Sequence, residues 1–230
     1  MLSWFNIIVH DLENYNIDIS KHLYGKLLDI GCGKKQELFR KKVKTYIGLD
    51  NQKTLTVNEG GNSSDADIMG DAMKLPFRKG EFDCVIALSL LEHVPEPQLV
   101  VNEAYRVLKK GGTFALTVPF MNRLHMAPYD YFRFTEFGLR HILKKAGFKI
   151  IKIKSSGGMW KMIGSRLSGY MYSDILGLGY GSDDLSVQRR PYLFPLFAPL
   201  IILTVVMARF LDRVHRTDKD AVIYYALCKK

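Results

Sequence analysis

Short apolar runs alternate with amphipathic segments along most of the 230-residue chain. An apolar run of this kind between turn residues predicts a buried strand, and apolar residues three and four positions apart predict a helix. Strands are predicted over residues 26–30, 45–49, 66–69, 82–88, 113–118, 148–154 and 221–228, and helices over 36–42, 97–108 and 135–146. The alternation predicts an α/β fold with a doubly wound parallel sheet.

Several boundaries carry their own signals. Thr135 is placed to cap the third predicted helix, and Gly147 to end it. Lys109–Gly112 combines basic residues with two glycines and predicts a turn that closes the helix over 97–108. Residues 1–24 have apolar positions at helical spacing, so a helix packed over one end of the sheet is expected there.

Residues 155–220 break the alternation and are interpreted as an apolar insertion between the last two strands. Within it, Tyr192–Ala208 lacks charged residues and has arginines on both sides. Its length is at the lower limit for a membrane span, but the last predicted strand has to return to the same sheet. Pro195 and Pro199 are expected to break a straight helix. We therefore expect an in-plane or re-entrant segment on a membrane, with a subunit interface or a cap over the substrate as alternatives.

The composition is that of a globular protein, with 47% hydrophobic and 24% charged residues. The formal net charge of +10 favours anionic partners such as nucleic acid, an acidic membrane surface or phosphorylated substrates. A solvated, lysine-rich surface explains the charge equally well. Met1–His10 has no basic leader and no cleavage site, so no secretory signal is predicted.

The three cysteines, Cys32, Cys84 and Cys228, are widely separated, and each lies in an apolar segment. We expect them to be small buried hydrophobic residues without disulfides, which is compatible with a reducing compartment. None stands at metal-ligand spacing from another cysteine or a histidine, so no metal site is predicted.

The first predicted strand ends in a Gly-x-Gly turn, Gly31 to Gly33, that leads into a helix. Such a turn lets the backbone approach a ligand closely, but alone it is a weak signal. Asp50 and Asp71 follow the second and third strands, and an acid about twenty residues after the turn suits ribose hydroxyls. A dinucleotide-binding fingerprint needs a third glycine where this chain has Gln36, so a nicotinamide enzyme is only a minor alternative.

The motifs in this order resemble those of class I S-adenosylmethionine-dependent methyltransferases, and most closely the small-molecule branch that includes quinone-biosynthesis enzymes. The resemblance covers most of residues 25–154 and the final strand, and implies a seven-stranded, Rossmann-like sheet with an antiparallel last strand in a single domain over residues 1–230. It rests on LLDIGCG at 27–33, YIGLD at 46–50, GDAMKLPF at 70–77, FDCVIALSLLEHVPEP at 82–97 and RVLKKGGTFALTVP at 106–119.

The resemblance implies that S-adenosylmethionine is the cofactor. Asp50 would accept hydrogen bonds from the ribose hydroxyls, and Asp71 would accept one from the adenine amino group. The remaining cofactor positions that it implies are Asp29, Gly31, Cys32, Gly33, Asn51, Ala72, Met73, Ser89 and Leu90. Acids and carbonyls also suit a sulfonium cation better than a basic phosphate site would.

The acceptor is expected beside the segment after the fifth strand, where PYDYFRFT at 128–135 resembles methyltransferases of glycans and cell-surface polysaccharides. We expect His125 to be the general base, with His93 after the fourth strand as a second candidate. Asp130 is the third catalytic candidate, and Tyr129, Tyr131 and Arg133 are expected to bind the acceptor. Alternatively, Tyr131, Phe132 and Phe134 pack under the loop and Arg133 pairs with Asp130.

The expected function is methyl transfer to a small molecule, first to a hydroxyl of a sugar or glycolipid and second to a quinone or isoprenoid lipid precursor. RNA ranks third, because the basic residues are scattered and not gathered in one stripe, so nucleic acid is not expected as a partner. A cofactor-binding regulator is the non-enzymatic alternative. We expect a cytoplasmic protein that contacts the inner face of the membrane through 191–213, and a homodimer is a further option.

Overall fold

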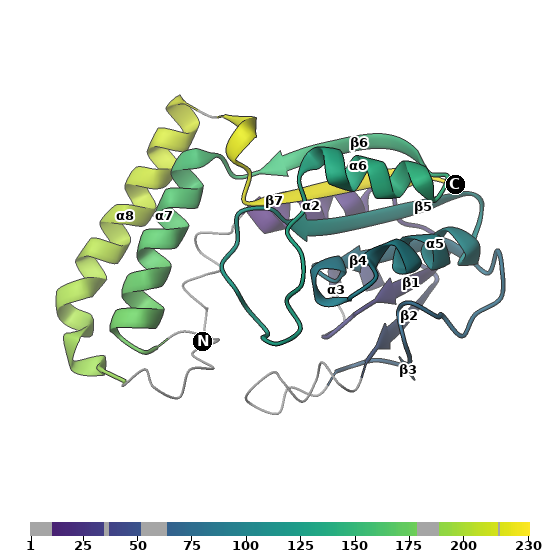
Figure 1. Ribbon diagram of the computed structural model, residues 1–230, viewed down its shortest axis with the longest axis horizontal. Coiled ribbons are helices and arrows are strands. Elements are labelled where there is room, and N and C mark those ends of the chain that lie inside the picture. The colour runs from purple at the N-terminus through teal and green to yellow at the C-terminus, as the bar shows by residue number, and fades with distance from the viewer. Residues whose placement is uncertain (1–10, 35–36, 52–63, 179–188, 216) are drawn as a thin grey trace.

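The computed structural model describes residues 11–34, 37–51, 64–178, 189–215 and 217–230, and its strands form a seven-stranded sheet in the order β3-β2-β1-β4-β5-β7-β6 (Figure 1). Neighbouring strands from β3 to β5 are parallel, whereas β7 runs antiparallel to both β5 and β6. This confirms the predicted Rossmann-like sheet with an antiparallel last strand. The strands are β1 Lys26–Ile30, β2 Thr45–Asp50, β3 Ile68–Met69, β4 Phe82–Leu88, β5 Leu108–Pro119, β6 Lys149–Ser156 and β7 Ile223–Lys229.

Helices cover both faces of the sheet. On β4, Val85 packs in one apolar cluster with α5 and α6, while Ile86 packs in another with α2 and α3. This is the alternation expected of a strand buried on both sides. The helices are α2 Asp11–Ser20, α3 Glu37–Arg40, α5 Pro97–Val107 and α6 Glu136–Lys145.

The predicted helix ends are partly confirmed. The Thr135 hydroxyl caps α6 by accepting a hydrogen bond from the Gly138 N–H at 3.0 Å. The predicted helix over 1–24 is described only from Asp11 onward, and Gln36 lies outside the described residues. All three cysteines are buried, as predicted.

The turn predicted at Lys109–Gly112 is wrong, because these residues belong to β5. Phe82 on β4 pairs with Leu108, and Cys84 pairs with Thr113, so four residues of β5 stand opposite a single residue of β4. Gly111 accommodates this irregularity with a φ of 77°. Pairing with the neighbouring strand therefore overrides the local turn composition.

The residues between β6 and β7 form a helical hairpin that projects beyond the sheet (Figure 1). It consists of α7 Met159–Gly169, a π-helical turn Tyr170–Ile175 (η2) and, after an interval, α8 Phe194–Val214. A Cβ added to Gly164 would lie only 2.3 Å from the Ala208 Cβ, so the two helices pack very closely at this point. 

The long helix α8 runs through Pro199 without ending, so the expectation that the prolines would break it is wrong. Pro195 stands in the first turn, where a backbone N–H has no helical partner in any case. Only Pro199 removes a helical hydrogen bond, and the apolar packing of the rest of α8 against α7 offsets that loss.

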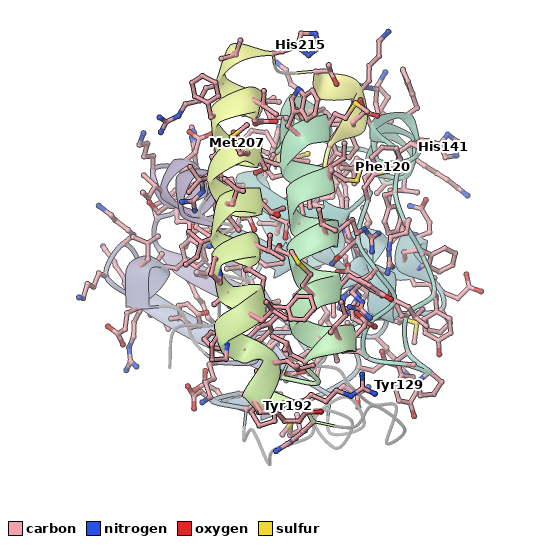
Figure 2. All side chains as sticks on the ribbon, turned by 90° about the vertical axis from the view of Figure 1, so that its left-hand side faces the viewer. Phe120, Tyr129, His141, Tyr192, Met207 and His215 are labelled. Atoms are coloured by element: carbon pink, nitrogen blue, oxygen red, sulfur yellow. The ribbon has the colours of Figure 1, made fainter. Side chains whose placement is uncertain are left out.

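One side of α8 has no partner in the described part of the chain. Ile201, Val205 and Ala208 are buried toward the hairpin, whereas Leu203 and Phe210 are 57% and 59% exposed. By length and composition, the segment 191–214 is apolar enough to cross a membrane. Figure 2 looks onto this hairpin from the side away from the sheet. The remaining large exposed apolar residues of α8 are Leu196, Leu200, Ile202, Val206, Met207 and Val214.

We predict that Gly164→Ala destabilises the hairpin, because the new methyl group overlaps with Ala208. The cost should be about 1–3 kcal/mol, typical of overpacking. Gly169→Ala is the matched control. Gly169 has helical φ and ψ of −63° and −41° and no atom within 4 Å of an added Cβ. It should gain about 0.5–1 kcal/mol. Urea unfolding with hydrogen exchange of both helices measures the difference, and equal protection in the two variants would contradict the close packing.

Candidate active site

The glycine turn after β1 is tied directly to the end of β2. Gly31 and Gly33 have φ values of 71° and 50°, which favour glycine. The Gly33 N–H donates a hydrogen bond of 2.9 Å to Asp50 Oδ2. A Cβ on Gly31 would meet the Leu90 side chain at 2.8 Å, whereas one on Gly33 would meet none of the described residues within 4 Å. Among the described residues, the space above the turn is therefore open at Gly33 and filled at Gly31.

Asp50 is the centre of this side of the site. Its Oδ2 also accepts a hydrogen bond from the Ser64 hydroxyl at 3.0 Å, and its Oδ1 accepts one from the Asn51 N–H at 2.8 Å. Cys32 is buried, with its Sγ 3.8 Å from the Ser64 Oγ. The structure thus brings together four predicted cofactor residues and adds Ser64, which the sequence motifs do not include. The four are Cys32, Gly33, Asp50 and Asn51.

The predicted adenine-binding segment lies at the end of β3. Asp71 is exposed, and its Oδ1 accepts a hydrogen bond of 2.8 Å from the Met73 N–H, so it forms a local turn. Ala72 is buried in the core cluster, and Met73 packs against the same cluster. No described contact links Asp71 to Asp50; only their positions at neighbouring strand ends relate them.

Asp29 is buried on β1 and accepts a hydrogen bond from the Tyr46 hydroxyl. Burial raises the pKa of this carboxyl to about 7, although the tyrosine hydrogen bond acts in the opposite direction. A further, smaller increase comes from the negative charge of Asp50. No basic side chain of the described residues contacts Asp29, and such a buried acid favours a nearby cation.

These residues fit the cofactor that the sequence resemblance implies. The open space lies over Gly33, and the groups around it are carboxylates, a hydroxyl and backbone N–H groups. A positively charged sulfonium and the hydroxyls of a ribose suit these groups. A pyrophosphate does not, because its negative charge would lie beside the carboxyl groups of Asp29 and Asp50. 

Ser89 and Leu90 follow β4 at the same edge of the sheet. Ser89 has a φ of 48°, unusual for a residue with a side chain. Its N–H is held by Thr117 on β5, whose Oγ1 accepts it at 2.9 Å. A strained conformation fixed by a neighbouring strand is typical of functional sites. Thr117 was not among the predicted residues.

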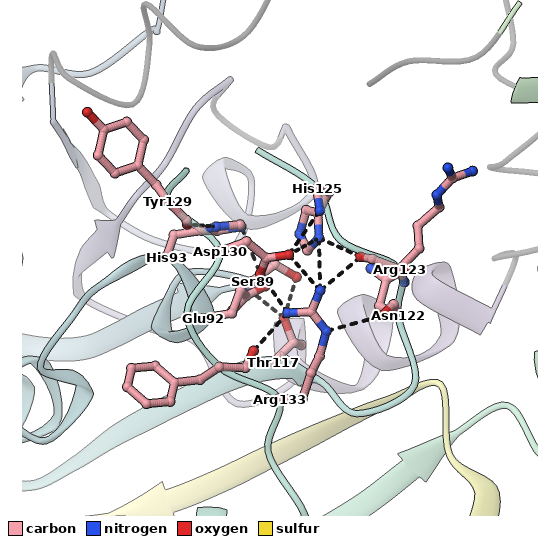
Figure 3. A network of polar contacts seen from close by, with 11 residues as sticks. Ser89, Glu92, His93, Thr117, Asn122, Arg123, His125, Tyr129, Asp130 and Arg133 are labelled. Atoms are coloured by element: carbon pink, nitrogen blue, oxygen red, sulfur yellow. Dashed lines mark hydrogen bonds and ion pairs between the residues drawn. The ribbon is translucent and has the colours of Figure 1, made fainter. Parts of the chain in front are cut away.

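The two candidate histidines lie side by side although they come from different loops (Figure 3). His93 ends a 3₁₀ turn, Leu91–His93 (η1), and its ring meets that of His125 edge to face with centroids 4.8 Å apart. The His93 Nδ1 lies 2.7 Å from the carbonyl oxygen of Tyr129. Burial lowers the pKa of His93, so a neutral ring is favoured.

A buried ion pair shapes the loop that carries His125. Asp130 has a side chain only 1% exposed and accepts two hydrogen bonds of 2.6 Å from Arg133. It also accepts one from the His125 backbone N–H at 2.9 Å. Burial opposes ionisation of Asp130, but Arg133 and the N–H outweigh it and lower its pKa. The alternative pairing of Arg133 with Asp130 is therefore found, and both side chains are engaged within the loop (Figure 3).

The aromatic residues of the loop differ in burial. Tyr131 and Phe132 are 46% and 38% exposed, whereas Phe134 is buried in the core. The Tyr131 N–H donates to the Glu92 carbonyl at 2.8 Å, which ties the loop to η1. Packing under the loop is thus found for Phe134, while Tyr129 is half-buried and Tyr131 is available at the surface.

The insertion also contributes to this region. Asp174 of η2 accepts hydrogen bonds of 2.8 and 2.9 Å from both terminal nitrogens of Arg123, and so fastens the loop to the hairpin. Burial, then the charges of Arg123 and Arg133, lower the pKa of Arg166 on α7. Glu92, Asp174 and Arg166 are site residues that sequence reasoning missed. For Glu92 the signal was present, since it directly precedes His93.

Comparisons with known proteins identify the family of this chain. Residues 28–116 match a family model described as a methyltransferase domain. A ubiquinone biosynthesis O-methyltransferase of Pseudomonas fluorescens (strain Pf0-1) is 31% identical over 190 residues, which cover 75% of this chain and 77% of that protein. A 2-methyl-6-phytyl-1,4-hydroquinone methyltransferase of Oryza sativa subsp. japonica is 33% identical over 129 residues. The match covers 54% of this chain but only 39% of that relative.

Solved structures support the fold. The crystal structure of a SAM-dependent methyltransferase from Archaeoglobus fulgidus superposes with a TM-score of 0.57 and 18% identity, covering 98% of this chain and 94% of that one. At this identity the likeness concerns the fold alone.

We predict that Asp29→Asn flattens part of the pH dependence of stability. The folded pKa of about 7 lies above the ordinary 3.8, so the folded state binds a proton that the unfolded chain releases. This contribution is complete below about pH 4 and is lost as the pH rises through 7. The variant should gain on the order of 2 kcal/mol relative to the parent between pH 5 and pH 8.

Urea unfolding at the two pH values measures this difference. Asp65→Asn, at an exposed position, is the control and should follow the parent. If Asp29→Asn also follows the parent, Asp29 is not protonated in the folded chain.

Proposed function

This chain belongs to the class I S-adenosylmethionine-dependent methyltransferases, and we infer that it methylates a phenolic hydroxyl of a lipid-soluble hydroquinone or catechol. The observation that carries the inference is the pair of imidazoles, His93 and His125, held at the edge of the sheet where the cofactor residues also end. A methyl acceptor has to lie in line with the sulfonium, and parallel strands bring both groups to that edge.

The acceptor class is supported by two relatives. One is named for ubiquinone biosynthesis and O-methylation, and the other for a phytyl hydroquinone. These names favour the quinone alternative over the sugar or glycolipid that the sequence first suggested. The exposed rings of Tyr131 and Phe132 suit a planar aromatic acceptor, since ring faces pack on one another.

The hairpin supports an acceptor that is dissolved in lipid. Its apolar α8 surface is exposed over most of its length, and such a surface needs a partner. Since β6 and β7 pair with each other through Ser156 and Ile223, the chain leaves and re-enters the sheet at one point. The helix α7 has 11 residues, about 16 Å, and contains Lys161 and Arg166, so it does not complete a pair of spans. We place α8 in the plane of the membrane surface instead.

The chain's own groups have separate tasks in this reaction. S-adenosylmethionine, when bound, supplies an electrophilic methyl group and departs as a neutral thioether. Asp50 and the Gly31–Gly33 turn hold the nucleoside, and Ser89 stands between the two halves of the site. His93 and His125 bind the acceptor hydroxyl and favour the loss of its proton. In both rings Nδ1 lies beside a carbonyl oxygen, so the other ring nitrogen is left for the hydroxyl. Asp130 and Arg133 act through the loop, as positioning residues.

A sugar acceptor, RNA and a purely regulatory role are outcomes of the same assay. We predict that the full chain transfers a labelled methyl group to a prenylated catechol or hydroquinone and to neither glycolipid nor RNA.

Asp50→Ala should lower the affinity for S-adenosylhomocysteine about 10- to 100-fold by calorimetry, because it removes charged hydrogen bonds. Glu136→Gln, on the surface of α6, is the control and should bind like the parent. Label in the glycolipid alone would contradict the acceptor class.

We also predict binding to vesicles that contain acidic lipid. Leu203→Glu and Phe210→Glu should each abolish co-flotation, since a charge on the apolar face of α8 opposes burial in lipid. Phe137→Glu is the matched control, because Phe137 is 80% exposed on α6, away from the hairpin. Flotation of all three variants like the parent would contradict the placement of α8.

A further inference from the structure

Three metal-binding side chains converge between the end of β4 and the loop after β5. Glu92, His93 and His125 each offer one ligand atom, and these atoms all lie within 4.8 Å of one another. Glu92 and His93 are buried, and His125 is half-buried. The cluster stands beside Ser89, on the acceptor side of the site (Figure 3).

Both imidazoles have oxygen acceptors beside Nδ1. The His93 Nδ1 lies 2.7 Å from the Tyr129 carbonyl oxygen, which can only accept, so this nitrogen carries the proton. The His125 Nδ1 lies 3.1 Å from the Arg123 carbonyl oxygen and 3.3 Å from Asp130 Oδ2; both acceptors are nearer than the Arg133 Nη2 donor at 3.5 Å, so we assign the proton to this nitrogen as well. The lone pairs are therefore on Nε2 in both rings. A histidine whose other nitrogen donates to a carbonyl or carboxylate is the usual form of a metal ligand.

Glu92 supplies the second and independent observation. Its side chain is 1% exposed, yet Oε2 has no hydrogen-bond partner among the described residues. The His93 Nε2 lies 3.8 Å from Glu92 Oε1, too far for a hydrogen bond. A buried carboxyl oxygen without a partner is costly and calls for a ligand.

We propose that Glu92, His93 and His125 bind a divalent transition-metal ion, with its remaining positions open toward the acceptor. Two imidazoles and one carboxylate suit zinc and its first-row neighbours, whereas magnesium and calcium prefer oxygen ligands alone. Binding would draw the three ligand atoms closer together than the present 4.8 Å, and His125 is the least buried of the three side chains.

In the proposed reaction the ion would activate the acceptor hydroxyl, and this part of the inference rests on the proposed function. A phenolic hydroxyl bound at an open position loses its proton to solvent more readily, because the cation stabilises the phenolate. The phenolate oxygen then forms a bond to the methyl carbon as the bond from that carbon to sulfur breaks. The His125 Nε2 binds the ion in this scheme, and does not itself take the proton.

The test uses the full chain, freed of metal by a chelator and then dialysed, and ZnCl2 as the probe. Calorimetry should show one zinc ion per chain. Cobalt in place of zinc should give visible absorption bands of a low-coordinate site. Glu92→Gln and His125→Gln should each weaken zinc binding at least 100-fold and remove the cobalt bands. His141→Gln, at an exposed position on α6, is the matched control and should bind like the parent.

The outcomes separate this inference from the proposed function. His125 is half-buried on a loop, so its variant is expected to fold even if Glu92→Gln does not, and thermal unfolding checks this. Absence of zinc uptake by the parent, or unchanged uptake by folded His125→Gln, would overturn the site. Zinc uptake that depends on these residues supports the site even if no quinol is methylated. Methyl transfer that proceeds at the full rate without metal would overturn the role given to the ion.

Discussion

The parallel pairing of β2, β1, β4 and β5 is the constraint on which the rest of the structure depends. Because hydrogen bonding fixes their register, the strands end along one edge, and each end contributes a different kind of group. β1 ends in glycines, β2 in the Asp50 carboxylate, and β4 in the strained Ser89 followed by Glu92 and His93. The polar groups are thus ordered by strand position, with glycines and an acid at the ends of β1 and β2 and imidazoles in the segments after β4 and β5.

The loop after β5 depends on a second constraint, the buried pair of Asp130 and Arg133. A charge buried this deeply is tolerated because several donors surround it, and removing one partner would leave the other uncompensated. The same pair presents Asp130 to His125, so the conformation of the loop and the orientation of the ring are set together. Arg123 extends this arrangement to Asp174, and thereby links the acceptor region to the hairpin.

Much of the fold could be predicted from the sequence, because both the strands and the helices of a doubly wound sheet have clear periodicity. β4 was predicted with its observed bounds, and Thr135 with its capping role. Failures occurred where tertiary contacts outweigh local preference, as in the irregular start of β5 and the passage of α8 through Pro199. The candidate histidines were identified, but their contact was not, because nothing in the spacing of His93 and His125 reveals that two loops meet. Glu92 was passed over for the same reason, since its isolation from partners is a property of the folded chain alone.

The position of β7 has a consequence for how the molecule assembles. In the chain β7 follows the hairpin, but in the sheet it lies between β5 and β6. Each of these strands pairs with β7, and they are not neighbours of each other in the sheet. Until β7 inserts, β5 and β6 each have an open edge. The hairpin that contains α8 joins β6 to β7, so the insertion of β7 closes the sheet and fixes both ends of the hairpin in the same step.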